Sequence, residues 1–243
     1  MATFIRQLLD TATEPYLQAG KFAWHFARGK LSGDPVFKEI LQRGLIAPNT
    51  HVIDIGCGQG LLSAWLLAAD TAATNKNWPS EWAKPPKGVT VNGIELMPND
   101  VERAKKALKA FPDRYTFETG DMCSTAFNKA QTVVILDVLH YVSFAAQEDV
   151  LLRVREALSP KGLLILRIGD ANAGLGFKIS NWVDNIVFLC RGHKMSRLYC
   201  RPLSDWLALL NKMNFHVEAK PMSEGTPFSN VLLLASIDNT SNV

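Results

Sequence analysis

Cysteines are scarce in this sequence, and long hydrophobic runs are absent. The chain has 4 cysteines in 243 residues, and none of them lies at the spacing of a CxxC pair or of a metal site. We therefore expect no metal centre and a reducing, cytoplasmic environment. No apolar segment is long enough to span a bilayer, and the N-terminus lacks the apolar core of a signal peptide, so we expect no membrane insertion.

A strong excess of charge of one sign is also missing. The formal net charge is only +3, which does not favour nucleic acid as the main partner. Hydrophobic residues make up 47% of the chain, so a sizeable core can form. The length is typical of one α/β domain over residues 1–243, and nothing in the sequence indicates the oligomeric state.

Short apolar runs alternate with helical patterns along most of the chain, which is typical of a parallel sheet covered by helices. The expected strands cover residues 51–55, 89–96, 115–118, 132–138, 163–168, 215–219 and 230–237. The helices expected between them cover residues 61–69, 98–111, 147–158 and 203–213. These patterns predict a Rossmann-like α/β fold with a doubly wound, mostly parallel seven-stranded sheet.

The most specific motif is VIDIGCGQG, which occupies residues 52–60. An apolar strand ends in Asp54, and Gly56, Gly58 and Gly60 follow before a helix. Glycines permit a tight turn and let a ligand approach the backbone, and the helix that follows offers unpaired N–H groups. A strand-to-helix turn that binds nothing would use the same residues, so this motif alone does not establish a site.

Chemically useful residues follow the next three strands as well. Glu95 ends the second strand, where an acid can accept hydrogen bonds from both hydroxyls of a ribose. After the third strand, Asp121 can accept from an adenine amino group while Met122 packs on the ring. The segment LDVLHYV follows the fourth strand. Because the carboxyl ends of parallel strands share one edge, we expect these segments to line one crevice.

Together, VIDIGCGQG, GIEL, GDM, LDVLHYV and LSPKGLLILR resemble the class I S-adenosylmethionine-dependent methyltransferases over residues 49–168. The resemblance implies that the chain is an enzyme that binds S-adenosyl-L-methionine and releases S-adenosyl-L-homocysteine. It also implies a set of cofactor-binding residues: Asp54, Gly56, Cys57, Gly58 and Gly60 on the methionyl side, Glu95 at the ribose, followed by Leu96 and Met97, Asp121 and Met122 at the adenine, and Asp137 and Val138 beside the methyl group.

The resemblance also divides the domain into four parts. Residues 1–48 form an N-terminal helical cap, residues 49–169 the cofactor-binding core, residues 170–202 a helical insert that serves as the substrate lid, and residues 203–238 the final helix and strands. Glu95 lies farther from the glycines than the roughly 20 residues typical of dinucleotide-binding folds, because a loop rich in Trp and Pro intervenes. A dinucleotide oxidoreductase is the competing interpretation, but its GxGxxG pattern does not match GCGQG.

His140 is the predicted catalytic residue, acting as a base for the acceptor. The alternative is that its ring only packs below the rim of the sheet, which is also the simpler explanation for Tyr141. Arg28 or Lys30 could pair with the cofactor carboxylate, although a solvated amphipathic helix would place charges there too. Further polar groups for an acceptor pocket are Asp170, Asn172, His193 and Tyr199.

The identity of the acceptor is less well determined. The sequence has neither an NPPY-type tetrapeptide at residues 136–139 nor a Pro-Cys nucleophile, which argues against nucleic acid. Segments such as FAWHFARGKLSGDPVF and RPLSDWLALL resemble methyltransferases encoded beside bacterial aryl polyene synthases, which are fatty-acid-like. That resemblance implies a small-molecule or carrier-bound aromatic or acyl acceptor, presented by an acyl carrier protein. The alternatives are an RNA or protein methyltransferase, or a module that binds the cofactor without catalysis.

Overall fold

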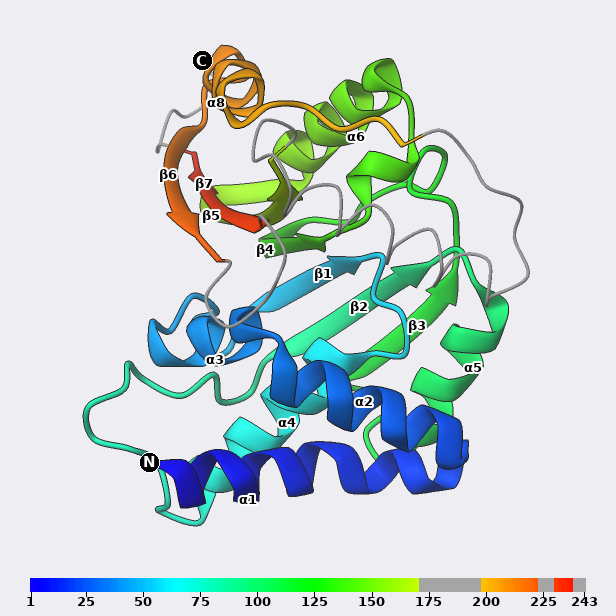
Figure 1. Cartoon of the computed structure of the whole chain (residues 1–243), viewed down its shortest axis with the longest axis vertical. Coiled ribbons are helices and arrows are strands. Elements are labelled where there is room, and N and C mark those ends of the chain that lie inside the picture. Colours follow the sequence, from blue (N-terminus) through cyan, green and yellow to red (C-terminus); the bar gives the residue numbers. More distant parts are fainter. Residues whose placement is uncertain (171–197, 223–229, 238–243) are drawn as a thin grey trace.

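Seven strands form one sheet in the order β3-β2-β1-β4-β5-β7-β6 (Figure 1). The computed structural model describes residues 1–170, 198–222 and 230–237. The strands are β1 (His51–Ile55), β2 (Thr90–Glu95), β3 (Tyr115–Thr119), β4 (Ala130–Leu136), β5 (Leu158–Gly169), β6 (His216–Pro221) and β7 (Asn230–Ser236). The first five strands run parallel, and β7 runs antiparallel between β5 and β6. The predicted fold class is confirmed.

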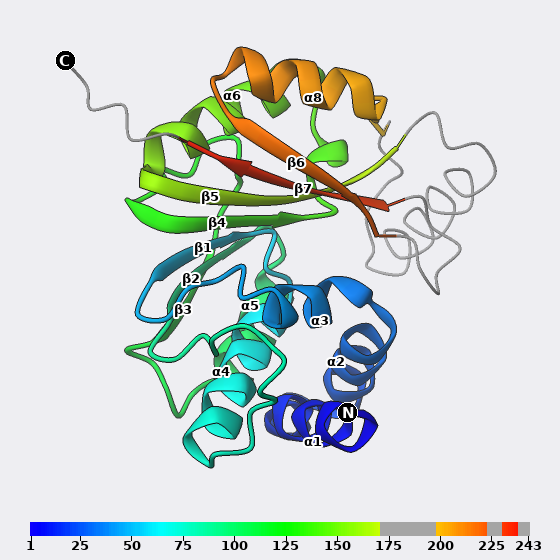
Figure 2. The ribbon, with the colours of Figure 1, turned by 90° about the vertical axis from the view of Figure 1, so that its left-hand side faces the viewer.

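Helices cover the two faces of the sheet in separate layers (Figure 2). One layer contains α1 (Ala2–Thr13), η1 (Glu14–Ala19), α2 (Lys21–Gly33), α3 (Pro35–Gln42), α4 (Leu61–Thr74) and α5 (Pro98–Ala107). The other contains η2 (Leu139–Tyr141), α6 (Phe144–Ala157) and α8 (Leu203–Lys212). The helical N-terminal segment is therefore confirmed. Within the described residues, no helix is both long and apolar enough to cross a membrane.

Most strand ends differ from the predictions by one or two residues, and two of the differences have a clear local cause. β5 begins at Leu158, five residues before the predicted start, because the Pro-Gly segment forms a bulge with Lys161 at φ +61 rather than a separate turn. β4 ends at Leu136, because Asp137 adopts a φ of +58 and takes the chain out of the sheet. α5 is also shorter than predicted and ends at Ala107.

Asp34 and Pro35 start α3 as their order in the sequence indicates. Asp34 Oδ1 accepts a hydrogen bond from the backbone N–H of Val36 at 3.1 Å, and Pro35 occupies the first helical position. The Trp- and Pro-rich loop packs back on the N-terminal layer: Trp78 and Trp82 meet the ring of Phe4 edge-on, with centroids 5.8 and 5.5 Å away. The loop thus contributes to the core far from the carboxyl edge of the sheet. Most of the predicted insert lies outside the described residues.

Gly93, in the middle of β2, has no room for a side chain. A Cβ atom there would lie 2.7 Å from the Sγ of Cys57 and 2.7 Å from a ring carbon of Phe117. We expect Gly93→Ala to lower the free energy of unfolding by about 1–3 kcal/mol through overpacking. In contrast, Gly29→Ala in α2, where a Cβ would meet nothing within 4 Å, should raise it by about 0.5–1 kcal/mol.

Urea denaturation of the two variants measures both effects. An equal change in both would contradict the close packing of Cys57 against β2.

Candidate functional site

The glycine turn is held tightly against the end of β2. Gly56, Gly58 and Gly60 all have positive φ angles, of 74°, 54° and 73°, and the backbone N–H groups of Gly56 and Cys57 both donate to the carbonyl of Ile94. A Cβ on Gly56 would come within 2.5 Å of Val138, which places the segment after β4 directly over the turn. The sequence motif therefore brings the ends of β1, β2 and β4 together.

Glu95 is the central polar group of this edge. Its side chain is 8% exposed, and its two carboxylate oxygens accept hydrogen bonds from the backbone N–H groups of Gly58 and Met97, each at 2.9 Å. Two backbone donors fix the carboxylate geometrically without neutralising its charge. Glu95 thus presents a well-oriented anion between the glycine turn and the start of α5.

Asp54 lies beside Glu95, one strand away. Burial, together with the negative charge of Glu95, raises the pKa of Asp54 from its ordinary 3.8 to about 7. Burial also raises the pKa of the Cys57 thiol well above its ordinary value, with further contributions from the charges of Asp54 and Glu95. Cys57 is therefore a neutral packing residue in this structure, whereas Asp54 can change its charge near neutral pH.

The GDM segment begins next to Glu95. The backbone N–H of Gly120 donates to the Glu95 carbonyl at 3.0 Å, and Asp121 Oδ1 accepts from the N–H of Cys123 at 2.8 Å. Leu96, the residue after Glu95, exposes 60% of its apolar side chain at the same edge. The structure thus brings a fixed carboxylate, an exposed apolar side chain and a compact turn to the ends of β2 and β3.

A buried cluster of charges stands on the other side of the turn. Arg167 of β5 is 2% exposed, and its guanidinium donates to both carboxylate oxygens of Asp34 and both of Asp137. Lys30 pairs with Asp34 at 2.8 Å and reaches Asp137 at 3.8 Å. Despite burial, the two cations hold the pKa of both aspartates below the ordinary range.

The sequence suggested roles for two members of this cluster. Asp137 was expected to border the methyl group, and that position remains a prediction; its carboxylate is bound by Arg167. Lys30 was considered as a partner for the cofactor carboxylate, and it pairs with protein carboxylates instead. Arg28 pairs with Asp10 at 2.7 Å on the surface. These contacts support the simpler structural explanation for both basic residues.

His140 lies on η2, just after the segment that covers the glycine turn. Burial lowers the pKa of His140, while the charge of Asp137 opposes this shift. Its carbonyl accepts from the N–H of Tyr199 at 2.9 Å, and Gln147 Nε2 donates to the Tyr199 carbonyl at 2.7 Å. Of the other predicted pocket residues, Asp170 accepts from the N–H of Leu203 at 3.1 Å, while Asn172 and His193 lie outside the described residues.

Sequence reasoning missed two residues that organise this edge. Tyr16 of η1 is fully buried, and its hydroxyl donates to the carbonyl of Gln59 in the glycine turn at 2.8 Å. No local pattern marks this contact between positions 43 residues apart. Arg167 could have been found: it is a lone charge in the apolar run LLILRIG, and a buried charge requires partners.

Removing the guanidinium of Arg167 would leave the largely buried carboxylate of Asp34 and the partly buried carboxylate of Asp137 without their main partner. We expect Arg167→Met to lower the free energy of unfolding by about 3–5 kcal/mol. Arg43 makes a bidentate salt bridge with Glu218, with hydrogen bonds of 2.9 and 3.0 Å, but on the surface. Arg43→Met should therefore cost less than about 1 kcal/mol. Chemical denaturation of both variants tests the contrast, and equal costs would contradict the burial of the Arg167 cluster.

The raised pKa of Asp54 predicts a specific pH dependence of stability. The folded protein holds this proton more tightly than the unfolded chain, so stability is lost as pH rises from the ordinary value of 3.8 towards about 7. Asp54→Asn removes this titration while keeping the shape of the side chain. The variant should gain stability relative to the natural protein across that window, measured as melting temperature against pH. Parallel pH profiles would contradict the raised pKa.

Comparison with known proteins fits this geometry. Residues 53–164 match a family model described as a methyltransferase domain. Two curated relatives are carboxy-S-adenosyl-L-methionine synthases, from Alteromonas mediterranea with 25% identity over 52% of this chain and from Chromohalobacter salexigens with 29% identity over 54%. In both cases the match covers 47% of the relative, so the chain spans about half the length of the curated relatives it matches.

A solved structure shares the fold over most of its length. Magnesium protoporphyrin IX methyltransferase from Synechocystis, with bound S-adenosylhomocysteine, superposes with a TM-score of 0.60 and 20% identity, covering 90% of this chain and 88% of that one. The family model covers the strands that carry the glycine turn, Glu95 and Asp137. These matches agree with the motifs: residues 53–164 match a methyltransferase domain, and the chain has the fold of solved S-adenosylmethionine-dependent methyltransferases.

Proposed function

We propose that this chain binds S-adenosyl-L-methionine at the carboxyl edge of its sheet and transfers the methyl group to a small-molecule or carrier-bound acceptor. The observation that carries the proposal is the buried carboxylate of Glu95, fixed by the N–H groups of Gly58 and Met97. A carboxylate so oriented at the end of β2 is suited to accept hydrogen bonds from two ribose hydroxyls.

The glycine turn is open on one side. A Cβ on Gly58 would meet no atom within 4 Å, whereas one on Gly60 would lie 2.9 Å from the ring of Phe117. Gly60 is therefore a packing requirement, and a bound molecule can approach Gly58 from the open side, while its N–H stays bound to Glu95. The turn thus fits the methionyl part of the cofactor, which would lie against Gly58 with Asp54 nearby.

The segments after β2 and β3 fit the rest of the cofactor. The exposed side chain of Leu96 offers an apolar surface for one face of an adenine ring, and Met122 offers a polarisable surface for the other. Asp121 supplies a carboxylate that can accept from the exocyclic amine. Val138, which covers Gly56, would border the methyl group.

S-adenosyl-L-methionine supplies a methyl group that is already activated by its sulfonium centre, so the protein needs mainly to position the acceptor and exclude water. The lowered pKa of His140 keeps its imidazole neutral near pH 7, the form that accepts a proton from a phenol or carboxylic acid. Asp137 stays ionised and bound to Arg167, so it holds the segment that carries His140 in place. His140 is therefore the base that we propose.

An aromatic or acyl acceptor is the more specific part of the proposal. Its support is the resemblance of the flanking segments to the methyltransferases of aryl polyene synthesis, which would present the acceptor on an acyl carrier protein. The lid that we expect for this acceptor falls mostly outside the described residues. The magnesium protoporphyrin enzyme, which has the same fold, is itself named for a small-molecule acceptor.

Calorimetric titration with S-adenosyl-L-homocysteine tests cofactor binding. We expect Glu95→Gln to weaken binding by about 1.5–3 kcal/mol, because the loss affects hydrogen bonds to a charged group. Glu118→Gln, an exposed carboxylate on the neighbouring strand β3, is the matched control and should leave the affinity unchanged. Unchanged affinity in Glu95→Gln would mean that another acid holds the ribose.

A second measurement tests group transfer. The protein is incubated with labelled S-adenosyl-L-methionine and a panel of phenols, aryl acids and acyl carrier conjugates, and the products are identified by mass. Methylated acceptor supports the proposal. No methylated product from any of these acceptors would overturn the proposed acceptor class, and methyl transfer only to RNA or protein, added in a parallel incubation, would replace it.

A further inference from the structure

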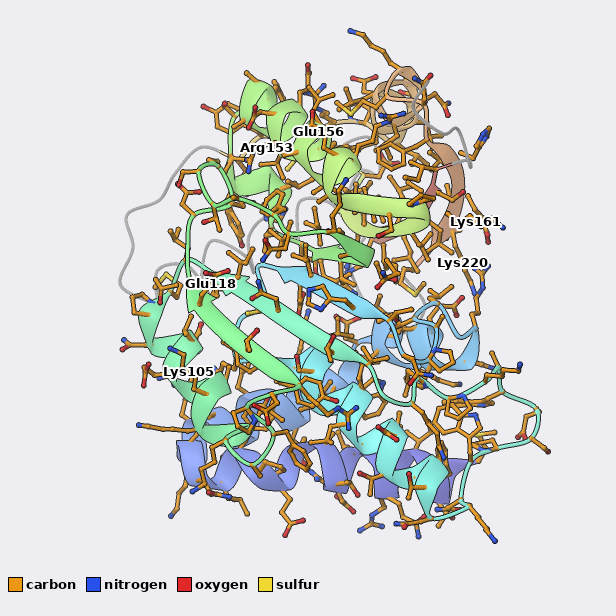
Figure 3. The ribbon with its side chains drawn as sticks, turned by 180° about the vertical axis from the view of Figure 1, so that it is seen from behind. Lys105, Glu118, Arg153, Glu156, Lys161 and Lys220 are labelled. Atoms are coloured by element: carbon orange, nitrogen blue, oxygen red, sulfur yellow. The ribbon has the colours of Figure 1, made fainter. Side chains whose placement is uncertain are left out.

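The connection between β3 and β4 lacks the helix that a parallel crossover usually contains. Residues 120–129 pass from one edge of the parallel strands to the middle of the sheet, and the structure assigns them no helix or strand. Figure 3 views this side of the molecule, with Glu118 on β3 and no described helix in front of it. The carbonyl groups of this connection therefore have no helix of their own in which to pair, and other elements can bind them.

Arg153 of α6 binds two of these carbonyl groups (Figure 3). Its Nη2 donates to the Met122 carbonyl at 2.5 Å, and its Nη1 donates to the Thr125 carbonyl at 2.9 Å. The guanidinium carbon lies 4.7 Å from the ring centre of Phe127, and Nε donates to Asp149 at 2.8 Å. One side chain thus holds the connection at three successive points.

The segment that Arg153 holds is the one that we expect to contact adenine. The N–H groups of Ser124 and Thr125 donate to the Asp121 carbonyl at 2.9 and 2.8 Å, so residues 121–125 form a compact turn. Gly120 ties the start of this turn to Glu95. Arg153 ties its middle and end to α6, so both anchors together set the position of Asp121 and Met122 relative to Glu95.

We propose that Arg153 is a positioning residue that makes the site selective for an adenine base. The proposal rests on the proposed function, since it assumes that Glu95 holds the ribose of the cofactor. Ribose and base are joined rigidly, so groups that recognise them must keep a fixed separation. A carboxylate held at the base favours adenine, whose exocyclic amine donates, over hypoxanthine, whose oxygen at the same position only accepts.

The test compares S-adenosyl-L-homocysteine with S-inosyl-L-homocysteine, in which an oxygen replaces the exocyclic amine and the neighbouring ring nitrogen carries a proton. Calorimetry on the full chain should show that Arg153→Met loses about tenfold or more in affinity for the adenine compound, the size expected for one hydrogen bond to a charged group. Affinity for the inosine compound should change little. The ratio of the two affinities, which measures the preference for adenine, should therefore fall. Arg153→Lys keeps one cationic donor group in place of the branched guanidinium. Its preference for the adenine compound should therefore lie between that of the natural protein and that of Arg153→Met.

Lys129→Met is the matched control. The Lys129 Nζ atom donates to the Glu156 carbonyl at 2.6 Å, so it joins the same connection to the same helix, but beyond the adenine turn. This variant should keep the natural preference for adenine. If Arg153→Met proves unstable by circular dichroism, Arg153→Lys carries the comparison.

Equal loss for both compounds in the Arg153 variants would overturn the proposal, because it would show a general structural role. A narrowed preference in Lys129→Met would overturn it as well, because any loosening of the connection would then suffice. Failure of the natural protein to bind S-adenosyl-L-homocysteine at all would instead contradict the proposed function itself.

Discussion

The buried guanidinium of Arg167 is the constraint around which the carboxyl edge is arranged. A charge with 2% exposure is stable only when its partners are held at the correct distance. Asp34 and Asp137 meet that requirement from two directions, the first from the cap and the second from the end of β4. Asp34 also accepts the hydrogen bond that begins α3. One carboxylate therefore both starts this N-terminal helix and pairs with Arg167 of β5. The N-terminal helical segment is therefore tied to the carboxyl edge of the sheet.

The carboxylates at this edge fall into two groups with different chemistry. Asp34 and Asp137 are paired with cations and remain ionised, whereas Asp54 and Glu95 form no salt bridge in the part of the chain that the structure describes. In the second group, burial and then the negative charge of Glu95 raise the pKa of Asp54. A positively charged ligand such as a sulfonium compound would relieve that repulsion, and its binding should release a proton near neutral pH.

The sheet was predictable because its information is local. Each strand is a short apolar run of its own, and β1 was predicted at its exact bounds, while the motif glycines and Glu95 lie where strand ends place them. The positions that could not be predicted depend on contacts between distant segments. Tyr16 acts through the carbonyl of Gln59, and Arg153 through carbonyls of a loop about 30 residues away. Backbone carbonyls are common to all residues, so the sequence does not reveal such partners. The roles in cofactor binding remain predictions.

The aromatic packing beneath the cap has an optical consequence. Trp78 and Trp82 lie edge-on to Phe4 of α1, and the indole of Trp65 in α4 donates to the carbonyl of Phe37 in α3. These three tryptophans therefore sit at contacts made by the N-terminal helices, and Trp24 lies on one of those helices, α2. Indole emission depends on the polarity around the ring, so detachment of these helices would shift the intrinsic fluorescence to longer wavelength. Intrinsic tryptophan fluorescence therefore reports whether the N-terminal helices are packed against the rest of the domain.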